Sequence, residues 1–334
     1  MKFAKQAREE LIYSLRGVVS PMLAALNRDE YDVRRTLVIS GYPRSGTTWL
    51  AEVVAAAART GIVFEPLNQL TVPAAKQAGC SWENFYLPDE PWPEGAAFMS
   101  DVLTGRVLTR WTASRLPLSR AANVSQWIVK FVRANQMLGW LVANFPVPPP
   151  VLLMRHPCAI FASWVERDWP LANYPPKRDR KFFQAYPGMV SMLDGLTEPE
   201  EFFAVQWSMQ HYSAVNHLSP EQYRACFYEK LVTERGAEVR RIFDHWKLAV
   251  PELLDEALDR PSSKAGATLQ VGGLGQITSW QKRVPAATAR RIISVLQRFG
   301  LDFYTLDPEP DYAAFAALQA RGQRAPAHSV SGVG

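Results

Sequence analysis

The feature that most constrains this chain is residues 36–50, TLVISGYPRSGTTWL, where an apolar run leads through a small-residue turn into a helix start. Strand, tight turn and helix N-terminus in this order form a loop whose free backbone N–H groups face an anion. The nucleoside-triphosphate version of this loop, GxxxxGKS/T, has lysine where this chain has Thr47, and this chain carries its cation three residues earlier, at Arg44. The segment therefore predicts a loop for a phosphate other than the γ-phosphate of magnesium-bound ATP.

Each residue type in this loop suits contact with a phosphorylated ligand. Gly41 and Gly46 permit close backbone approach. Arg44 supplies a full positive charge, and Trp49 offers a flat face on which a purine can stack. We assign to ligand binding the consecutive residues Arg44, Ser45, Gly46, Thr47, Thr48 and Trp49.

Five short apolar runs without strict alternation are typical of buried parallel strands. They are residues 36–41, 62–64, 127–132, 151–154 and 223–228. Helical patterns between them, at residues 48–59, 135–144, 159–165 and 236–246, supply the crossovers. The pattern predicts an α/β fold of three layers, with a central, mostly parallel sheet of about five strands and ligands at their carboxyl ends.

A second constellation lies in residues 151–164, VLLMRHPCAIFASW. A buried strand ends directly in Arg155, and Pro157 then starts a helix whose first two turns bring Ser163 near that arginine. A fixed guanidinium and a hydroxyl suit a second, separate phosphate. Taken alone, Arg155 could also be explained by a structural role, as an arginine in a salt bridge at the end of a strand. A phosphate-transferring ATPase would more naturally end such a strand in a magnesium-holding aspartate.

At these residues the chain resembles the sulfotransferases that use 3′-phosphoadenosine 5′-phosphosulfate (PAPS), and is closer to their carbohydrate and bacterial types than to the cytosolic aryl members. YPRSGTTW resembles the family's 5′-phosphosulfate loop, commonly YPKSGTTW. Arg155 and Ser163 repeat its 3′-phosphate pair at the same spacing. The resemblance spans roughly residues 36–300 and implies the P-loop-like sulfotransferase architecture with PAPS as co-substrate.

Two further segments carry the resemblance. CFYEKL, residues 226–231, resembles the family's FYEDL-type strand and helix and implies Tyr228 near the nucleotide. GGLGQITSWQKR, residues 272–283, resembles the C-terminal GxxGxW loop and implies nucleotide contacts for Gly275 and Trp280, although the interval between these two residues is longer than in the common cytosolic pattern.

The resemblance also implies the catalytic groups. In WIVKFVR, residues 127–133, Lys130 occupies the position of the family lysine that contacts the transferring sulfonate. Cytosolic aryl and steroid members have histidine two residues later, where this chain has Val132. VFEPL, residues 63–67, matches the FEP-like sequence of carbohydrate-type members. We therefore interpret Glu65 as the base and Lys130 and Arg44 as stabilisers of the developing charge.

The alternative for Glu65 is structural, as a cap or a bridge to Arg44 or Lys130. The position of His156 favours a role on the 3′ side of the nucleotide or in packing, rather than a role at the acceptor. The other histidines on helical segments favour core or surface roles, namely His211, His217 and His245.

The amino-acid composition narrows the ligands and the cellular compartment that can be expected for this chain. The net charge of +5 and pI near 9.1 fit an anionic ligand, but the basic residues are scattered, which argues against nucleic acid. Three cysteines without a CxxC pair favour a reducing compartment, and no metal site is indicated. With no apolar run of about 18 residues and no signal peptide, we expect a cytoplasmic protein.

We expect a single domain over residues 31–310, with aromatic lid insertions near 70–125 and 166–200, although many of these rings can instead form a satellite core. The apolar spacing in residues 1–30 predicts an amphipathic helix. We expect this helix to pack on its own domain or on a second subunit, and the second arrangement would give a homo-oligomer. Contact of the helix with a membrane surface is the less favoured role. Residues 319–334 predict a disordered tail.

The function expected is sulfonate transfer to a hydroxyl of a glycan, glycolipid or natural product. Two alternatives stay open. One is a P-loop kinase or nucleotide hydrolase using ATP, against which Thr47 and Arg155 both argue. The other is a non-catalytic nucleotide-binding protein, which would retain the loop but tolerate loss of Lys130 and Glu65.

Overall fold

The computed structural model describes residues 31–58, 60–81, 91–116, 124–169, 180–259 and 273–322, together with positions 14, 15, 19 and 22, which are helical. The predicted N-terminal helix otherwise lies outside the described residues. Among the described helices, none is long and apolar enough to cross a membrane.

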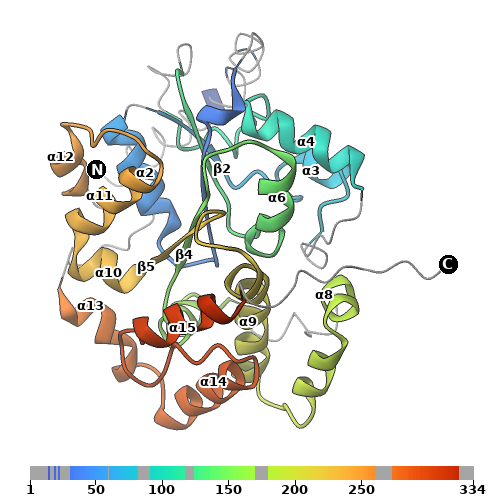
Figure 1. Ribbon diagram of the computed structural model, residues 1–334, viewed down its shortest axis with the longest axis vertical. Helices are drawn as coiled ribbons and strands as arrows, with labels where there is room; N and C mark the ends of the chain where they lie inside the picture. The colour runs from blue at the N-terminus through green and yellow to red at the C-terminus, as the bar shows by residue number, and fades with distance from the viewer. Residues whose placement is uncertain are drawn as a thin grey trace.

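Five parallel strands form one sheet, as predicted from the five apolar runs (Figure 1). The strands are β1 (Leu37–Gly41), β2 (Gly61–Phe64), β3 (Trp127–Lys130), β4 (Val151–Met154) and β5 (Arg224–Phe227). Their order in the sheet is β2-β3-β1-β4-β5, and every neighbouring pair is parallel. The chain therefore crosses from one side of β1 to the other between β3 and β4. The carboxyl ends of β1 and β4 lie at this switch point.

The predicted crossover patterns form helices within one or two residues of the expected bounds, with residues 135–144 divided into a 3₁₀ turn and a short helix. In the first half of the chain the helical elements are η1 (Val33–Arg35), α2 (Thr47–Ala58), α3 (Pro73–Gln77), α4 (Pro93–Leu103), η2 (Asn135–Met137), α6 (Leu138–Asn144) and α7 (Pro157–Val165). In the second half they are α8 (Arg180–Ala185), η4 (Pro187–Leu193), α9 (Pro199–His217), α10 (Tyr228–Thr233), α11 (Arg235–His245), α12 (Leu254–Leu258), α13 (Leu274–Thr278), η5 (Ser279–Lys282), α14 (Ala286–Arg298) and α15 (Tyr312–Gly322).

Two apolar cores, one on each face of the sheet, make the three layers. Successive strand residues point to opposite faces. Leu37 and Ile39 pack into a core shared with α2, α11 and α12, whereas Val38 packs into a larger core shared with α6 and α9. Figure 1 shows α2, α11 and α12 on one side of the sheet and α4 and α6 on the other. Every strand except β5 is buried along its whole length, which explains the apolar runs without alternation.

The described rings of the first predicted lid pack inward rather than over an open site. Trp92 lies 5.3 Å from Trp140, ring centroid to ring centroid, and its indole N–H donates to the Ala78 carbonyl oxygen. Trp111 packs 5.5 Å from Phe64, at the end of β2. Both rings pack against the large apolar core on the α6 and α9 face of the sheet. Outside the described residues are Trp82, Phe85 and Tyr86.

In the second predicted lid, the described rings range from fully buried to partly exposed. Phe182 is fully buried and lies 4.9 Å from Tyr186 and 6.1 Å from Tyr212 of α9, ring centroid to ring centroid. Trp169 is partly exposed and packs edge-on against Trp164 of α7.

The tail prediction was wrong for residues 319–322, because α15 continues to Gly322. Phe315 and Leu318 are buried, and Gln319 Nε2 donates to the Tyr223 hydroxyl at 3.0 Å. Helix α15 packs against α9.

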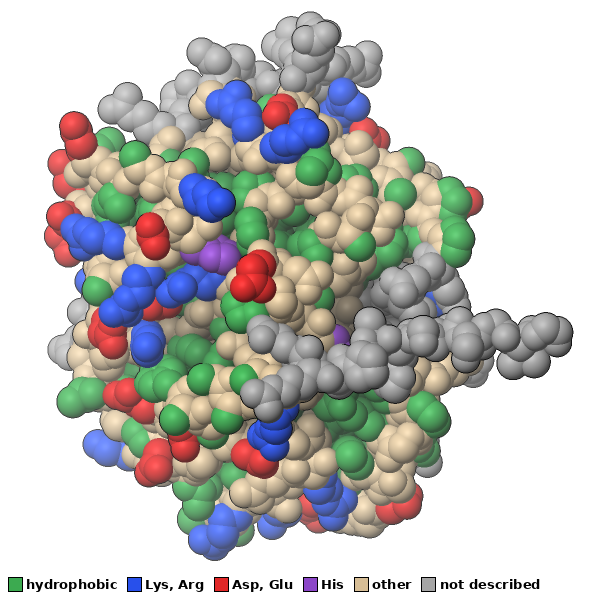
Figure 2. All heavy atoms as spheres, in the orientation of Figure 1, with side chains coloured by type: hydrophobic (Ala, Val, Ile, Leu, Met, Phe, Trp, Pro, Cys, Tyr) green, Lys and Arg blue, Asp and Glu red, His purple; other side chains and the backbone are tan. Residues whose placement is uncertain are grey.

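Basic side chains on the visible face are interspersed with acidic ones (Figure 2). On α11, Arg241 pairs with Glu234 at 2.6 Å and Arg240 pairs with Asp255 at 2.7 Å. Much of the positive charge on this helix is therefore balanced locally.

Candidate functional site

The loop predicted to bind phosphate lies at the switch point of the sheet. It follows β1 directly, while Arg155 follows β4, and these two strands are hydrogen-bonded neighbours. In open parallel sheets, ligands bind in the crevice outside the carboxyl ends of strands at such a point.

The loop backbone has the shape that an anion requires. Ser45 N–H donates to the Tyr42 carbonyl oxygen at 3.0 Å, closing a turn, and Leu50 N–H donates to the Gly46 carbonyl oxygen at 3.1 Å as α2 begins. The first-turn N–H groups of a helix have no acceptor within it. Arg44 and Gly46 both have positive φ angles, of 77° and 97°. A backbone in which residues with positive φ alternate with a residue of ordinary φ points its successive N–H groups into one concavity.

Close approach explains why position 46 is glycine. An added Cβ would lie 2.8 Å from Cδ2 of Tyr228, so no other side chain fits without moving that ring. The predicted loop residue Ser45 is fully buried, and its hydroxyl has no hydrogen-bond partner among the described residues. A buried polar atom without a partner is costly, and a ligand phosphate would satisfy it.

Arg44 and Ser163 meet directly, as the predicted assignment of both to one ligand requires. Arg44 Nε donates to Ser163 Oγ at 3.0 Å. Burial, together with the neighbouring guanidinium groups of Arg167 and Arg155, lowers the pKa of Arg44 to about 10. Arg44 is therefore still cationic at neutral pH. Like charges gathered in a partly buried site raise the affinity for an anion.

Arg155 joins the same group. Its Nη1 donates to the Arg44 carbonyl oxygen at 2.9 Å, and its guanidinium carbon lies 4.2 Å above the Tyr228 ring. Its Nε is buried and has no hydrogen-bond partner in the part of the chain that the structure describes. The Tyr228 hydroxyl accepts a hydrogen bond from Gln276 Nε2. The structure thus brings together Arg44 from the loop after β1, Arg155 and Ser163 from the segment of β4 and α7, and Tyr228 from the start of α10.

Lys130 and Glu65 form a second cluster at the carboxyl ends of β3 and β2. Lys130 lies beside Ile39 of β1 and Phe64 of β2 in the sheet. Its ammonium is 2.5 Å from Glu65 Oε1 and 4.7 Å from the centre of the Phe64 ring. The Lys130 side chain is 2 % exposed, and that of Glu65 is 19 % exposed. The carboxylate is therefore the member of the pair that solvent reaches.

Glu65 is held in an unusual backbone conformation. Its φ is 45°, in the left-handed region that non-glycine residues rarely adopt, and its N–H donates to the Lys130 carbonyl oxygen at 2.8 Å. Strain of this kind persists where the surroundings fix it and is frequent at functional sites. The predicted bridge between Glu65 and Lys130 is present. An ion pair does not exclude proton acceptance by the same carboxylate.

The remaining predicted ligand residues differ in their burial and contacts. Trp280 is buried, with its ring stacked on His156 at 4.5 Å between centroids, and Gly275 is exposed with open space around it. Trp49 is partly buried, with the guanidinium of Arg235 5.9 Å from its ring centroid. Thr47 is buried at the start of α2, next to the partly buried Thr48. The structure thus gives Trp280 a packing role.

His156 packs rather than facing an acceptor, and His211 is also fully buried. Burial lowers the pKa of His156 to about 3 and that of His211 to about 4, so both rings are neutral near pH 7. His217 stacks on Tyr186, and half-buried His245 ends α11.

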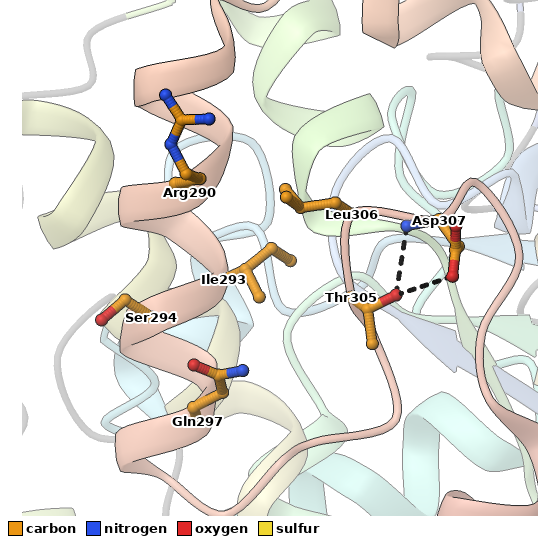
Figure 3. A pocket seen from close by; sticks show the side chains of 7 residues that line it. All are labelled: Arg290, Ile293, Ser294, Gln297, Thr305, Leu306 and Asp307. Carbon is orange, nitrogen blue, oxygen red and sulfur yellow. Dashed lines mark hydrogen bonds between the residues drawn. The ribbon is translucent and has the colours of Figure 1, made fainter.

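A surface pocket of about 390 Å³ lies between α14 and residues 305–307 (Figure 3). Its walls include Arg290, Ser294 and Gln297 on the helix and Thr305 and Asp307 on the facing turn. It contains none of the predicted site residues. The chemistry of the charged clusters, rather than this hollow, therefore identifies the candidate site.

Sequence comparison gives no match: no family model matches the chain, and no curated protein matches it.

Among the described residues, no three His, Cys, Asp or Glu side chains gather as a metal-binding group.

Comparison with solved structures finds chains of similar arrangement, among them the following three. A sulfotransferase domain from the Synechococcus PCC 7002 olefin synthase is 15% identical, with a TM-score of 0.45, over 84% of this chain and 98% of that one. A sulfotransferase domain from the curacin biosynthetic pathway is 16% identical, with a TM-score of 0.45, over 81% and 98%. A sulfotransferase from Mycobacterium tuberculosis is 16% identical, with a TM-score of 0.40, over 83% of each chain.

Proposed function

We propose that this chain is a sulfotransferase that moves the sulfonate group of PAPS to a hydroxyl group of an organic acceptor. The observation that carries the proposal is the meeting of Arg44, Ser163 and Arg155 between the ends of β1 and β4. Two guanidinium groups beside a turn of free N–H groups suit a ligand with two separate phosphate groups. A nucleotide with 3′ and 5′ groups has that form.

The loop residues fit the 5′ side of such a nucleotide. The unpartnered Ser45 hydroxyl and the close approach at Gly46 are features that a bound phosphosulfate would use. Arg155, with its buried unpartnered Nε, supports the 3′ side together with Ser163. Thr47 stands where a lysine would contact the γ-phosphate of ATP, which disfavours the kinase alternative.

Lys130 and Glu65 support a transfer reaction rather than binding alone. In the proposed step, the acceptor oxygen forms a bond to sulfur as the bond between sulfur and the bridging phosphate oxygen breaks. Glu65 takes the hydroxyl proton, and Lys130 neutralises the negative charge that grows on the bridging oxygen. The products are the sulfated acceptor and adenosine 3′,5′-bisphosphate.

The acceptor that we propose is a glycan, a glycolipid or a natural product with a free hydroxyl. Two observations support this choice of acceptor. Position 132 is valine rather than histidine, and the carboxylate of Glu65 is accessible to solvent.

The test is transfer of ³⁵S from labelled PAPS to a panel of hydroxyl acceptors, with and without Lys130→Ala. We expect labelled product with the wild-type chain and a loss of roughly 100-fold or more with the variant. Tight nucleotide binding without transfer to any acceptor would favour the non-catalytic alternative.

A further inference from the structure

A buried carboxyl group behind the candidate site has no place in the proposed reaction. Glu229 is the second residue of α10 and is 1% exposed. Its Oε1 accepts the backbone N–H of His156 at 2.9 Å, and its Oε2 accepts the Tyr304 hydroxyl at 3.0 Å. A carboxyl is seldom buried without a specific partner, and here it has one partner on each oxygen.

These two hydrogen bonds join three segments that lie far apart in the sequence. His156 belongs to the turn after β4, Glu229 to the turn after β5, and Tyr304 to the segment that follows α14. Arg155 immediately precedes His156, and Tyr228 immediately precedes Glu229. The guanidinium of Arg155 lies over the Tyr228 ring. The Glu229 carboxyl therefore fixes the backbone on both sides of this contact.

The far side of the turn is fixed as well. His156 Nε2 lies 3.0 Å from the Thr305 carbonyl oxygen, and its Nδ1 accepts the Cys158 N–H at 3.2 Å. Thr305 is itself held by the Asp307 N–H, which donates to its hydroxyl at 3.1 Å (Figure 3). Since His156 is neutral and packed, the charge of the turn comes from Arg155. The direction in which Arg155 extends depends on how the turn is held.

We propose that Glu229 is a positioning residue for the 3′-phosphate of the donor, acting through the turn that carries Arg155; this inference rests on the proposed function. Glu229 does not touch the ligand. Its removal leaves a buried N–H of His156 without an acceptor and frees the backbone next to Arg155. Small misplacement of a binding group lowers affinity strongly.

The test compares two probes, adenosine 3′,5′-bisphosphate and adenosine 5′-monophosphate, by isothermal titration calorimetry. We expect Glu229→Ala to weaken binding of the bisphosphate about tenfold or more and to change binding of the monophosphate less than about twofold. Glu229→Gln keeps an oxygen for His156 and a group that can bond the Tyr304 hydroxyl, so it restores most of the affinity.

Glu238→Ala is the matched control. Glu238 is also a buried carboxylate, but it pairs with Arg224 and Arg241 on the α11 side. We expect this variant to lower the melting temperature while the affinity ratio of the two probes stays unchanged. If Glu229→Ala does not fold, Tyr304→Phe removes one hydrogen bond of the same carboxyl, and we expect it to lower the affinity ratio severalfold.

The outcomes separate this inference from the proposed function. A wild-type chain that binds both probes equally contradicts the 3′-phosphate site itself. A wild-type chain that prefers the bisphosphate, combined with an unchanged ratio in Glu229→Ala or in Tyr304→Phe, overturns the role of Glu229 and leaves the proposed function in place. An equal loss for both probes shows that Glu229 is only structural and also overturns the inference.

Discussion

Replacing Glu229 with glutamine should change how the stability of the fold depends on pH. Burial is the main cause that raises the pKa of Glu229 to about 7 from its ordinary value of 4.5, against the lowering effect of its hydrogen bonds and of Arg155. The folded chain therefore binds a proton on this carboxyl between about pH 4.5 and 7, where the unfolded chain has already lost it. Glutamine has the same shape and does not titrate.

The sign and size follow from linkage between protonation and folding. When the folded state binds more protons than the unfolded state, the free energy of unfolding falls as the pH rises. Each pH unit of difference in pKa corresponds to about 1.4 kcal/mol, so the fall amounts to about 3 kcal/mol, complete just above pH 7. His156 and His211 act in the opposite sense below pH 6.5, because burial lowers their pKa values. They are present in both chains, so their effect cancels in the difference.

Urea unfolding of the wild-type chain and of Glu229→Gln at pH 5, 6, 7 and 8 measures this difference. We expect the stability of the wild-type chain relative to the variant to fall steadily from pH 5 to pH 7 and to level off by pH 8. A difference that stays constant over the series, or that grows with pH in favour of the wild-type chain, refutes the reasoning about the buried carboxyl.

Three further predictions concern the candidate site. Lys130→Ala should lower kcat by roughly 100-fold or more while nucleotide affinity changes little, as steady-state kinetics and calorimetry can show. Arg155→Ala should weaken binding of adenosine 3′,5′-bisphosphate by roughly 10- to 100-fold, since a charge-assisted hydrogen bond is lost, and unchanged affinity would refute the 3′-phosphate assignment. Gly46→Ala should lower unfolding stability by about 1–3 kcal/mol because of the Tyr228 ring and the positive φ, and also weaken nucleotide binding; a neutral result would contradict the close approach.

The fold was predictable because its signals are local. Short buried strands and the loop after β1 each occupy a few consecutive residues, so apolar runs and turn residues located all five strands. The same holds for Arg44 and Arg155, which follow the neighbouring strands β1 and β4 and meet there, and for Lys130, which ends β3 beside β1.

The parts that were missed depend on distant partners. Glu229 is separated from His156 by 73 residues and from Tyr304 by 75, so no local pattern indicates its burial. The stacking of Trp280 on His156 likewise depends on the packing of η5 against α7, which no local pattern indicates. The small and polar composition of residues 319–334 predicted a tail, whereas residues 319–322 continue α15, and Gln319 donates a hydrogen bond to Tyr223, 96 residues away.

Nucleotide preference tests the central claim most directly. Calorimetric titration of the wild-type chain with adenosine 3′,5′-bisphosphate in EDTA, and in parallel with ATP and Mg²⁺, compares the two ligands that the loop could serve. The arrangement of Arg44, Ser163 and Arg155 predicts that the bisphosphate binds without metal and at least about tenfold tighter than magnesium-bound ATP. Tighter binding of ATP that disappears in EDTA would contradict it.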